Sequence, residues 1–157
     1  MSIPPLVQAL MAHYERAFTG PNGNYPAILE TVAGVSVAQA LWKPAPTANS
    51  IWRIVEHLIA SKEWQIKILK NVPTATPVWI EPTGDEAKWQ AALTRLEDAH
   101  RRLMVVIENI DEADLLKVPV PEWGRTLLEL ILSFGPSHDA HHSGQIDYLR
   151  GLQAEKT

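Results

Sequence analysis

Apolar residues recur every three or four positions in four long segments of the chain, and turn-forming residues separate these segments. In the first segment Leu6, Leu10, Tyr14 and Phe18 are spaced by four, and the segment ends at GPNGNYP, residues 20–26. This spacing is typical of one face of an amphipathic helix, and glycine with proline ends such a helix. The first segment is therefore predicted to be a helix.

A second helix is predicted to begin near Ile51. The preceding sequence KPAPTANS, residues 43–50, contains two prolines that interrupt the periodicity, and Asn49 or Ser50 can cap the helix. The helix is predicted to end before VPTATP, residues 72–77. Its broad apolar face consists of Ile51, Ile54, Val55, Leu58, Ile59, Ile66 and Leu69.

Two capping-box sequences mark the predicted starts of the third and fourth helices, TGDE at 83–86 and TLLE at 126–129. The stripe of the third helix is Trp89, Leu93, Leu96, His100, Leu103, Ile107 and Ile110. The stripe of the fourth is Leu127, Ile131, Phe134, His138, then His141 or His142, Gln145 and Leu149. Histidines therefore lie on the predicted core side, and Pro136 predicts a bend just before them.

Four amphipathic helices bury their apolar stripes most simply against one another, so the sequence predicts an all-α four-helix bundle. The connection at residues 19–49 is long enough for a crossover, and SVAQALW, residues 36–42, predicts a short extra helix within it. The chain has 157 residues and no repeat, linker or low-complexity tract. Residues 1–157 are therefore predicted to form a single domain.

Composition narrows the possible functions. The net charge of −4 and the absence of any Lys/Arg-rich run give no electrostatic reason to expect nucleic-acid binding. The N-terminal sequence has no basic start, and polar residues interrupt its apolar ones, so neither a signal peptide nor a membrane span is expected and the cytoplasm is the expected location. Because the chain has no cysteine, a metal would be held by His, Asp, Glu or backbone oxygen.

The sequence SHDAHHSGQ, residues 137–145, contains three of the six histidines. Measured around the helix from Leu127, His138 lies at about 20°, His141 at about −40° and His142 at about 60°. His138 can share an ion with His142 at i+4, or nearly so with His141 at i+3. A metal-free polar cluster and a solvated helix face are the alternatives to a metal site.

A catalytic metal site usually takes a third protein ligand, for which the spacing offers several histidines. His57 borders the apolar face of the second helix, His100 lies in the middle of the third stripe, and His13 lies beside the first. HDAHH also matches the His-x-x-x-His half of the zinc-protease signature, but Asp139 stands where that mechanism needs glutamate. A protease is therefore not favoured, and Asp139 is interpreted as an acceptor for a ligand or as solvated charge.

Two stretches of the chain resemble the DinB-like (DinB/YfiT) family of bacterial metal-binding helical bundles: ALWKPAPTANSIWRIVEHLIASKEW at 40–64 and TLLELILSFGPSHDAHHSGQIDYLRGL at 126–152. In such proteins a histidine after a Pro-rich, Ser-capped helix start joins a His-x-x-x-His pair that continues into a Gly-Gln-Ile type sequence. The resemblance implies that His57, His138 and His142 are the ligands. It also implies a DinB/YfiT-type bundle, a divalent ion, zinc or nickel first, and homodimers.

An ion with three histidine ligands and an open position can lower the pKa of bound water toward about 7, bind a thiolate or polarise a carbonyl. Some relatives resemble mycothiol-dependent isomerases and bacillithiol transferases. The resemblance therefore implies a thiol transferase or hydrolase that uses a low-molecular-weight thiol and a small-molecule substrate. The alternatives are a non-enzymatic metal-binding or stress-associated protein and a metal-free dimerisation module. No residue is identified as the general base, and the candidate pocket residues are Arg53, Trp52, Ser61, Glu63, Trp64, His100, His141 and Gln145.

Overall fold

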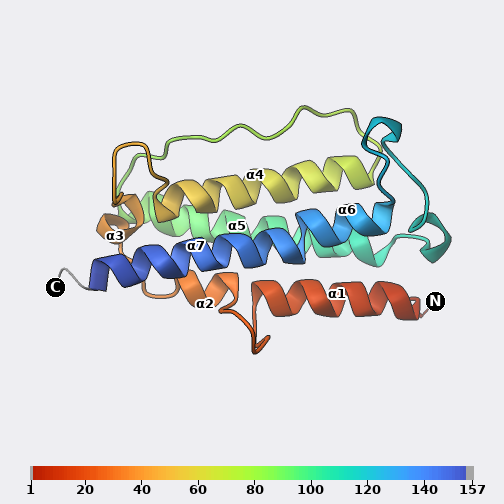
Figure 1. Cartoon of the computed structure of the whole chain (residues 1–157), viewed down its shortest axis with the longest axis horizontal. Coiled ribbons are helices and arrows are strands. Elements are labelled where there is room, and N and C mark those ends of the chain that lie inside the picture. Colours follow the sequence, from red (N-terminus) through yellow and green to blue (C-terminus); the bar gives the residue numbers. More distant parts are fainter. Residues whose placement is uncertain (1, 155–157) are drawn as a thin grey trace.

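Every regular element within residues 2–154, which the computed structural model describes, is a helix. The bundle consists of α1 (Pro5–Phe18), α4 (Ile51–Leu69), α5 (Glu86–Glu108) and the consecutive pair α6 (Leu127–Phe134) and α7 (Pro136–Ala154) (Figure 1). The short elements are α2 (Ile28–Val32), α3 (Val37–Leu41) and two 3₁₀ turns, Glu112–Asp114 and Pro121–Trp123. The predicted all-α bundle is confirmed. None of the helices in the described range combines the length and apolar character needed to cross a membrane.

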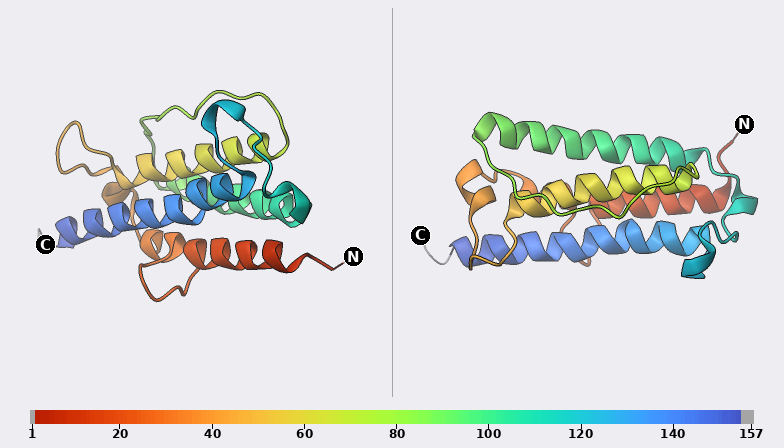
Figure 2. Two further views of the ribbon diagram at one scale, coloured as in Figure 1. Left: turned by 45° about the vertical axis from the view of Figure 1, so that its right-hand side comes forward. Right: turned by 90° about the horizontal axis from the view of Figure 1, so that it is seen from above.

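The connection that runs the length of the bundle is residues 70–85, between α4 and α5. It lies along the outer side of α4 in both Figure 1 and the right-hand view of Figure 2, so that α4 and α5 run in the same direction. Residues 19–49, where the sequence places the long connection, instead contain α2 and α3 and extend from the end of α1, near the middle of the bundle, to the end at which α4 begins. The five-residue α2 was not predicted, because so short a helix shows no periodicity.

The helix starts follow local capping chemistry. Ser50 caps α4 by accepting a hydrogen bond from the backbone N–H of Arg53 (3.1 Å), and the predicted capping box at Thr126 is present. The predicted box at Thr83 is wrong, because Asp85 caps α5 instead. An aspartate is at least as good an N-cap as a threonine, and this one immediately precedes the first helical turn.

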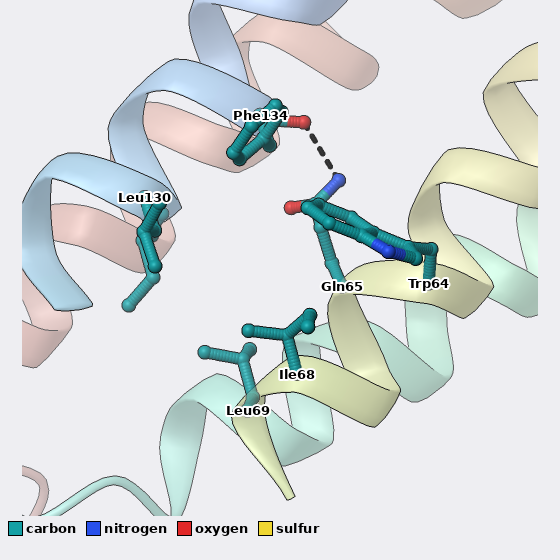
Figure 3. A pocket seen from close by; sticks show the side chains of 7 residues that line it. Trp64, Gln65, Ile68, Leu69, Leu130 and Phe134 are labelled. Carbon is teal, nitrogen blue, oxygen red and sulfur yellow. Dashed lines mark hydrogen bonds between the residues drawn. The ribbon is translucent and has the colours of Figure 1, made fainter. Parts of the chain in front are cut away.

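The fourth predicted helix is divided at Gly135 into α6 and α7, which confirms the bend expected before His138. Gly135 has φ −103° and ψ −105°, outside the helical region. The Phe134 carbonyl accepts a hydrogen bond of 2.6 Å from the Gln65 side chain of α4 (Figure 3). This hydrogen bond therefore connects α4 to the end of α6, one helical turn before His138.

Gly135→Ala is expected to lower the free energy of unfolding by about 1–3 kcal/mol, as overpacked cores usually do. A Cβ at this position would lie 2.1 Å from Cε2 of Tyr14, whose ring is fully buried. Gly151→Ala in α7 is the control, because its Cβ would meet nothing within 4 Å and alanine is favoured over glycine in a helix by about 1 kcal/mol. Urea denaturation of both variants measures the difference, and equal stabilities would contradict the close contact.

Candidate metal centre

Three histidine side chains from two helices converge between α4 and α7. Nε2 of His138 lies 3.1 Å from Nε2 of His57 and 3.1 Å from Nε2 of His142. The three ligand atoms all lie within 4.8 Å of one another. His138 and His142 share one face of α7 because residues four apart stack on a helix. Together these three side chains form a cluster that could hold a metal ion.

The protons of the three rings cannot satisfy this arrangement by themselves. A neutral imidazole has one N–H, so His138 can donate to at most one of its two close neighbours. At most one of the two 3.1 Å contacts can therefore be a hydrogen bond between histidines, whereas a cation at the centre would be bound by all three Nε2 atoms. A separation of 3.1 Å also suits two nitrogens bound to one ion at about 2.0–2.1 Å. The donor set therefore fits a divalent metal.

The environment keeps the three imidazoles neutral at pH 7. Burial, followed by the neighbouring His142 and His57, lowers the pKa of His138 to about 3. Burial likewise lowers the pKa of His142 to about 4, although its hydrogen bond with Gln145 acts in the opposite direction. Burial also lowers the pKa of His57. The neutral ring is the form that binds a metal ion.

Gln145 orients the ring of His142. The Gln145 Oε1 atom lies 2.8 Å from Nδ1 of His142, and its Nε2 lies 3.1 Å from Nε2 of His141. An amide oxygen only accepts, so the proton of His142 is on Nδ1 and its Nε2 lone pair faces the cluster. His141 is exposed and is not a member of the converging group.

Gln145→Leu is expected to weaken divalent-metal affinity by about 10–100-fold, which is the usual effect of losing the group that orients a histidine ligand. The variant keeps all three ligands, so the stoichiometry should stay the same. Competition with a chelating indicator measures the change. Gln153→Leu, on the same helix but hydrogen-bonded to the Gln39 carbonyl, should bind metal as the unmodified protein does. Unchanged affinity in Gln145→Leu would contradict the orienting role.

Trp79, from the segment 70–85, covers one side of the cluster. Its ring stacks on His57 with centroids 3.8 Å apart and an interplanar angle of 3°, and it lies 6.0 Å from the ring of His142. The Arg53 guanidinium carbon lies 5.4 Å from the Trp79 ring centroid. Nδ1 of His57 is buried and has no hydrogen-bond partner. Trp79 therefore limits the access of water to this ring.

A buried ion pair joins α4 to α7 beside the cluster. The Lys62 ammonium donates to both carboxylate oxygens of Asp139, at 3.0 and 2.8 Å, and each side chain is 1% exposed. Lys62 also lies over the rings of Tyr14 and Phe18, at 5.3 and 5.0 Å. The interpretation of Asp139 as solvated charge is therefore wrong, and its hydrogen bonds go to Lys62 instead of to a histidine.

His100 occupies a separate interior position between α1 and α5. Its ring stacks on Phe18 with centroids 3.8 Å apart, and its Nε2 lies 3.2 Å from a carboxylate oxygen of Glu15. Burial, and then the positive charge of Lys62, lowers the pKa of His100 to about 3. The ring is therefore neutral at pH 7, and its N–H donates to Glu15 as a neutral donor.

The low pKa of His100 predicts a loss of stability in acid. The pKa rises from about 3 in the folded chain to the ordinary 6.5 on unfolding, so protonation favours the unfolded state. Above pH 6.5 His100 is neutral in both states and does not lower the free energy of unfolding. As the pH drops from 6.5 toward 3, His100 lowers the free energy of unfolding by about 1.4 kcal/mol per pH unit. Urea denaturation of chelator-treated protein at pH 7.5 and 4.5 should show a smaller pH effect in His100→Leu. His13→Leu, at an exposed position, should keep the full effect.

The remaining predicted pocket residues divide into two groups. Arg53 and Ser61 lie beside the cluster, and the Ser61 hydroxyl is 3.5 Å from Nε2 of His57, too far for a strong hydrogen bond. The others face different neighbours: Trp52 packs against α5, Glu63 forms an ion pair with α5, and Trp64 packs against α6.

An apolar pocket between α4 and α6 lies apart from the histidines. Figure 3 shows its lining side chains pointing toward one another from the two helices. The residues that line it are Trp64, Gln65, Ile68, Leu69, Leu130, Ile131 and Phe134. Because none of the three clustered histidines lines it, this pocket is separate from the histidine cluster.

Trp79 and Lys62 were not identified from the sequence. Trp79 lies in VPTATPVWIEP, residues 72–82, which has neither helical nor strand periodicity and so indicates no neighbour. Lys62 lies between Ser61 and Glu63 in the sequence, and charged residues in such polar stretches are usually exposed. The sequence feature that points to a buried partner for Lys62 is Asp139, a residue of opposite charge next to the predicted core position His138.

Comparisons with known proteins agree with this architecture. Residues 23–146 match the family described as the DinB superfamily. The chain is also similar to a solved structure described as the crystal structure of the conserved protein of locus from Enterococcus faecalis, with 20% sequence identity, 96% of each chain covered and a TM-score of 0.65. At that identity the likeness shows the fold alone. No curated protein matches the sequence.

Proposed function

Since the chain belongs to the DinB superfamily, we propose that it is a metal protein in which His57, His138 and His142 hold one divalent ion. The observation that carries this proposal is the pair of 3.1 Å contacts made by Nε2 of His138, of which the histidine protons can satisfy only one. Three neutral imidazoles suit zinc, nickel, cobalt or ferrous iron, and zinc and nickel are our first expectations.

We further propose that the centre belongs to an enzyme, a thiol transferase or a hydrolase. Catalytic sites typically have three protein ligands and structural sites four, and the cluster within residues 2–154 has three. The bound ion supplies Lewis acidity, which lowers the pKa of a thiol or of water. Gln145 keeps the ring of His142 in the ligand tautomer, Trp79 shields the face of His57, and Arg53 attracts a negative group.

The test combines metal analysis with an activity screen. Native protein is analysed for metal content and then assayed for transfer of several low-molecular-weight thiols, and for hydrolysis, with electrophilic small molecules. One ion per chain, together with activity that His57→Ala abolishes, is the expected result. Full metal loading without activity toward any thiol or hydrolysable substrate would exclude the enzymatic role and leave metal binding intact.

A non-enzymatic metal-binding protein is the second candidate. The stacking of Trp79 on His57 favours it, because a covered centre restricts the approach of a substrate. Trp79→Ala distinguishes the two roles: a non-enzymatic protein keeps its metal and stays inactive, whereas an enzyme changes its rate.

We also propose that the protein forms homodimers in solution. The resemblance to DinB-like proteins supports this proposal. Sedimentation equilibrium of the metal-loaded and chelator-treated protein tests it, and a monomer in both states would contradict it. Dimers without any metal uptake would instead favour a metal-free dimerisation module.

A further inference from the structure

Three charged side chains meet next to the start of α4. Nζ of Lys43 lies 2.5 Å from one carboxylate oxygen of Glu81, and Nε of Arg53 lies 3.5 Å from the other. Glu81 belongs to the segment 70–85, which Figures 1 and 2 show running along α4. The carboxylate of this segment is therefore held between two cations, one from the chain that enters α4 and one from its first turn.

The guanidinium of Arg53 is only partly satisfied by this contact. Its Nε is buried and has no hydrogen bond, and the 3.5 Å contact with Glu81 exceeds the usual charge-assisted distance of about 2.7–2.9 Å. The side chains of Arg53 and Lys43 are 26% and 24% exposed, whereas that of Glu81 is 51% exposed. A guanidinium is shaped to bind a carboxylate through two parallel hydrogen bonds. Lys43 and Arg53, the cationic pair, are thus more enclosed than the Glu81 carboxylate that they hold.

This cationic pair is adjacent to the three histidines. Arg53 precedes His57 by four residues, so the two lie on the same face of α4, about 6 Å apart along its axis. Trp79 contacts both, since its ring stacks on His57 and lies 5.4 Å from the guanidinium carbon. The N-terminus of α4, capped by Ser50, adds positive potential.

We infer that Lys43 and Arg53 form the recognition site for the carboxylate of a small substrate, and that Glu81 occupies this site when the substrate is absent. The inference rests on the proposed metal-dependent function, because it places the reacting group of the substrate at the three-histidine centre. The site suits a compact carboxylic acid, because Arg53 and His57 are only one helical turn apart on α4. When the substrate carboxylate displaces Glu81, the segment 70–85 moves away with Trp79 and uncovers His57.

Opposite effects of two substitutions separate this role from a structural one. As a tethered competitor, Glu81 lowers the fraction of protein that can bind a carboxylate, so its removal strengthens binding. Removal of Arg53 takes away the binding group and weakens it. If the ion pairs only brace the segment 70–85, loss of either partner loosens the same contact, and both substitutions change affinity in the same direction.

The experiment titrates the metal-loaded protein with succinate and follows binding by isothermal titration calorimetry. Glu81→Gln is expected to bind succinate about tenfold more tightly. Arg53→Gln should bind it at least about tenfold more weakly, and Lys43→Gln should also weaken binding. Glu97→Gln, at an exposed position on α5, is the matched control and should leave the affinity unchanged. The same direction of change in Glu81→Gln and Arg53→Gln, or no change in either, would overturn the inference.

The metal content of each variant separates this inference from the proposed function. Opposite affinity changes in a protein that takes up no metal would support the carboxylate site and reject the metal centre. Full metal loading without those changes would reject the carboxylate site alone. Inorganic phosphate, titrated in parallel, should bind more weakly than succinate, and tighter phosphate binding would contradict the carboxylate as the recognised group.

Discussion

His138→Ala is expected to abolish stoichiometric binding of divalent metal, whereas His141→Ala should retain it. Nε2 of His138 is the atom that lies 3.1 Å from both other ligand nitrogens, so its loss leaves two histidines with no shared neighbour. Removing a ligand should cost more than the loss of an orienting partner, that is, more than about 100-fold in affinity. Metal content after dialysis against equimolar zinc or nickel measures the difference.

The thermal midpoint provides an independent measure of the same prediction. A ligand that binds only the folded chain raises its stability, so added metal should raise the midpoint of the unmodified protein and of His141→Ala but not that of His138→Ala. His141 is matched to His138 in chemistry and lies on the same helix, but it is exposed. Retention of metal by His138→Ala, or its loss in His141→Ala, would reject the assignment of ligands.

Lys62→Met is expected to lower the free energy of unfolding by about 3–5 kcal/mol, the usual cost of leaving one member of a buried pair without its partner. Lys62 and Asp139 are each 1% exposed, so water cannot replace the lost ammonium. Burial raises the pKa of Asp139, and the positive charge of Lys62 opposes that rise. Without Lys62, the variant should therefore hold a proton on Asp139 to a higher pH. Urea denaturation at pH 7 measures the loss of stability.

Two further variants test the cause of this loss. In Lys62→Met/Asp139→Leu no charge remains buried, so much of the stability should return. Arg95→Met removes the partner of Glu56 in a pair whose arginine is 54% exposed, and it should cost less than about 1 kcal/mol. A double variant as unstable as Lys62→Met would show that lost packing, instead of the unpaired charge, causes the effect.

The positions of the long helices could be predicted because capping residues and apolar periodicity, which determine them, are local features of the sequence. The start of α4 at Ile51 and the capping box at Thr126 both depend on residues within one turn, and the apolar periodicity marks the buried face. The start of α5 was misplaced at Thr83 because two capping residues compete within three positions there. The five-residue α2 is held by its contacts with the rest of the bundle, which no local pattern reveals.

The choice between His141 and His142 as the partner of His138 does not follow from the local sequence. Helical spacing allowed either His141 or His142 to pair with His138, and only the family resemblance favoured His142. In the structure His142 is buried and faces His57, whereas His141 is exposed. The rotation of α7 about its axis decides between them, and that rotation depends on the break at Gly135 and on the packing of α7 against α4.

The sequence by itself determined the all-helical class, most of the helix ends and the residues from which a histidine site could be built, because these depend on neighbours within a few positions. The tertiary structure decided which residues meet across helices. Lys62 and Asp139 are 77 positions apart, and Trp79 reaches His57 from a segment without periodicity. Such contacts depend on how the helices pack and on the path of the connection over α4, and nothing near either partner in the sequence specifies them.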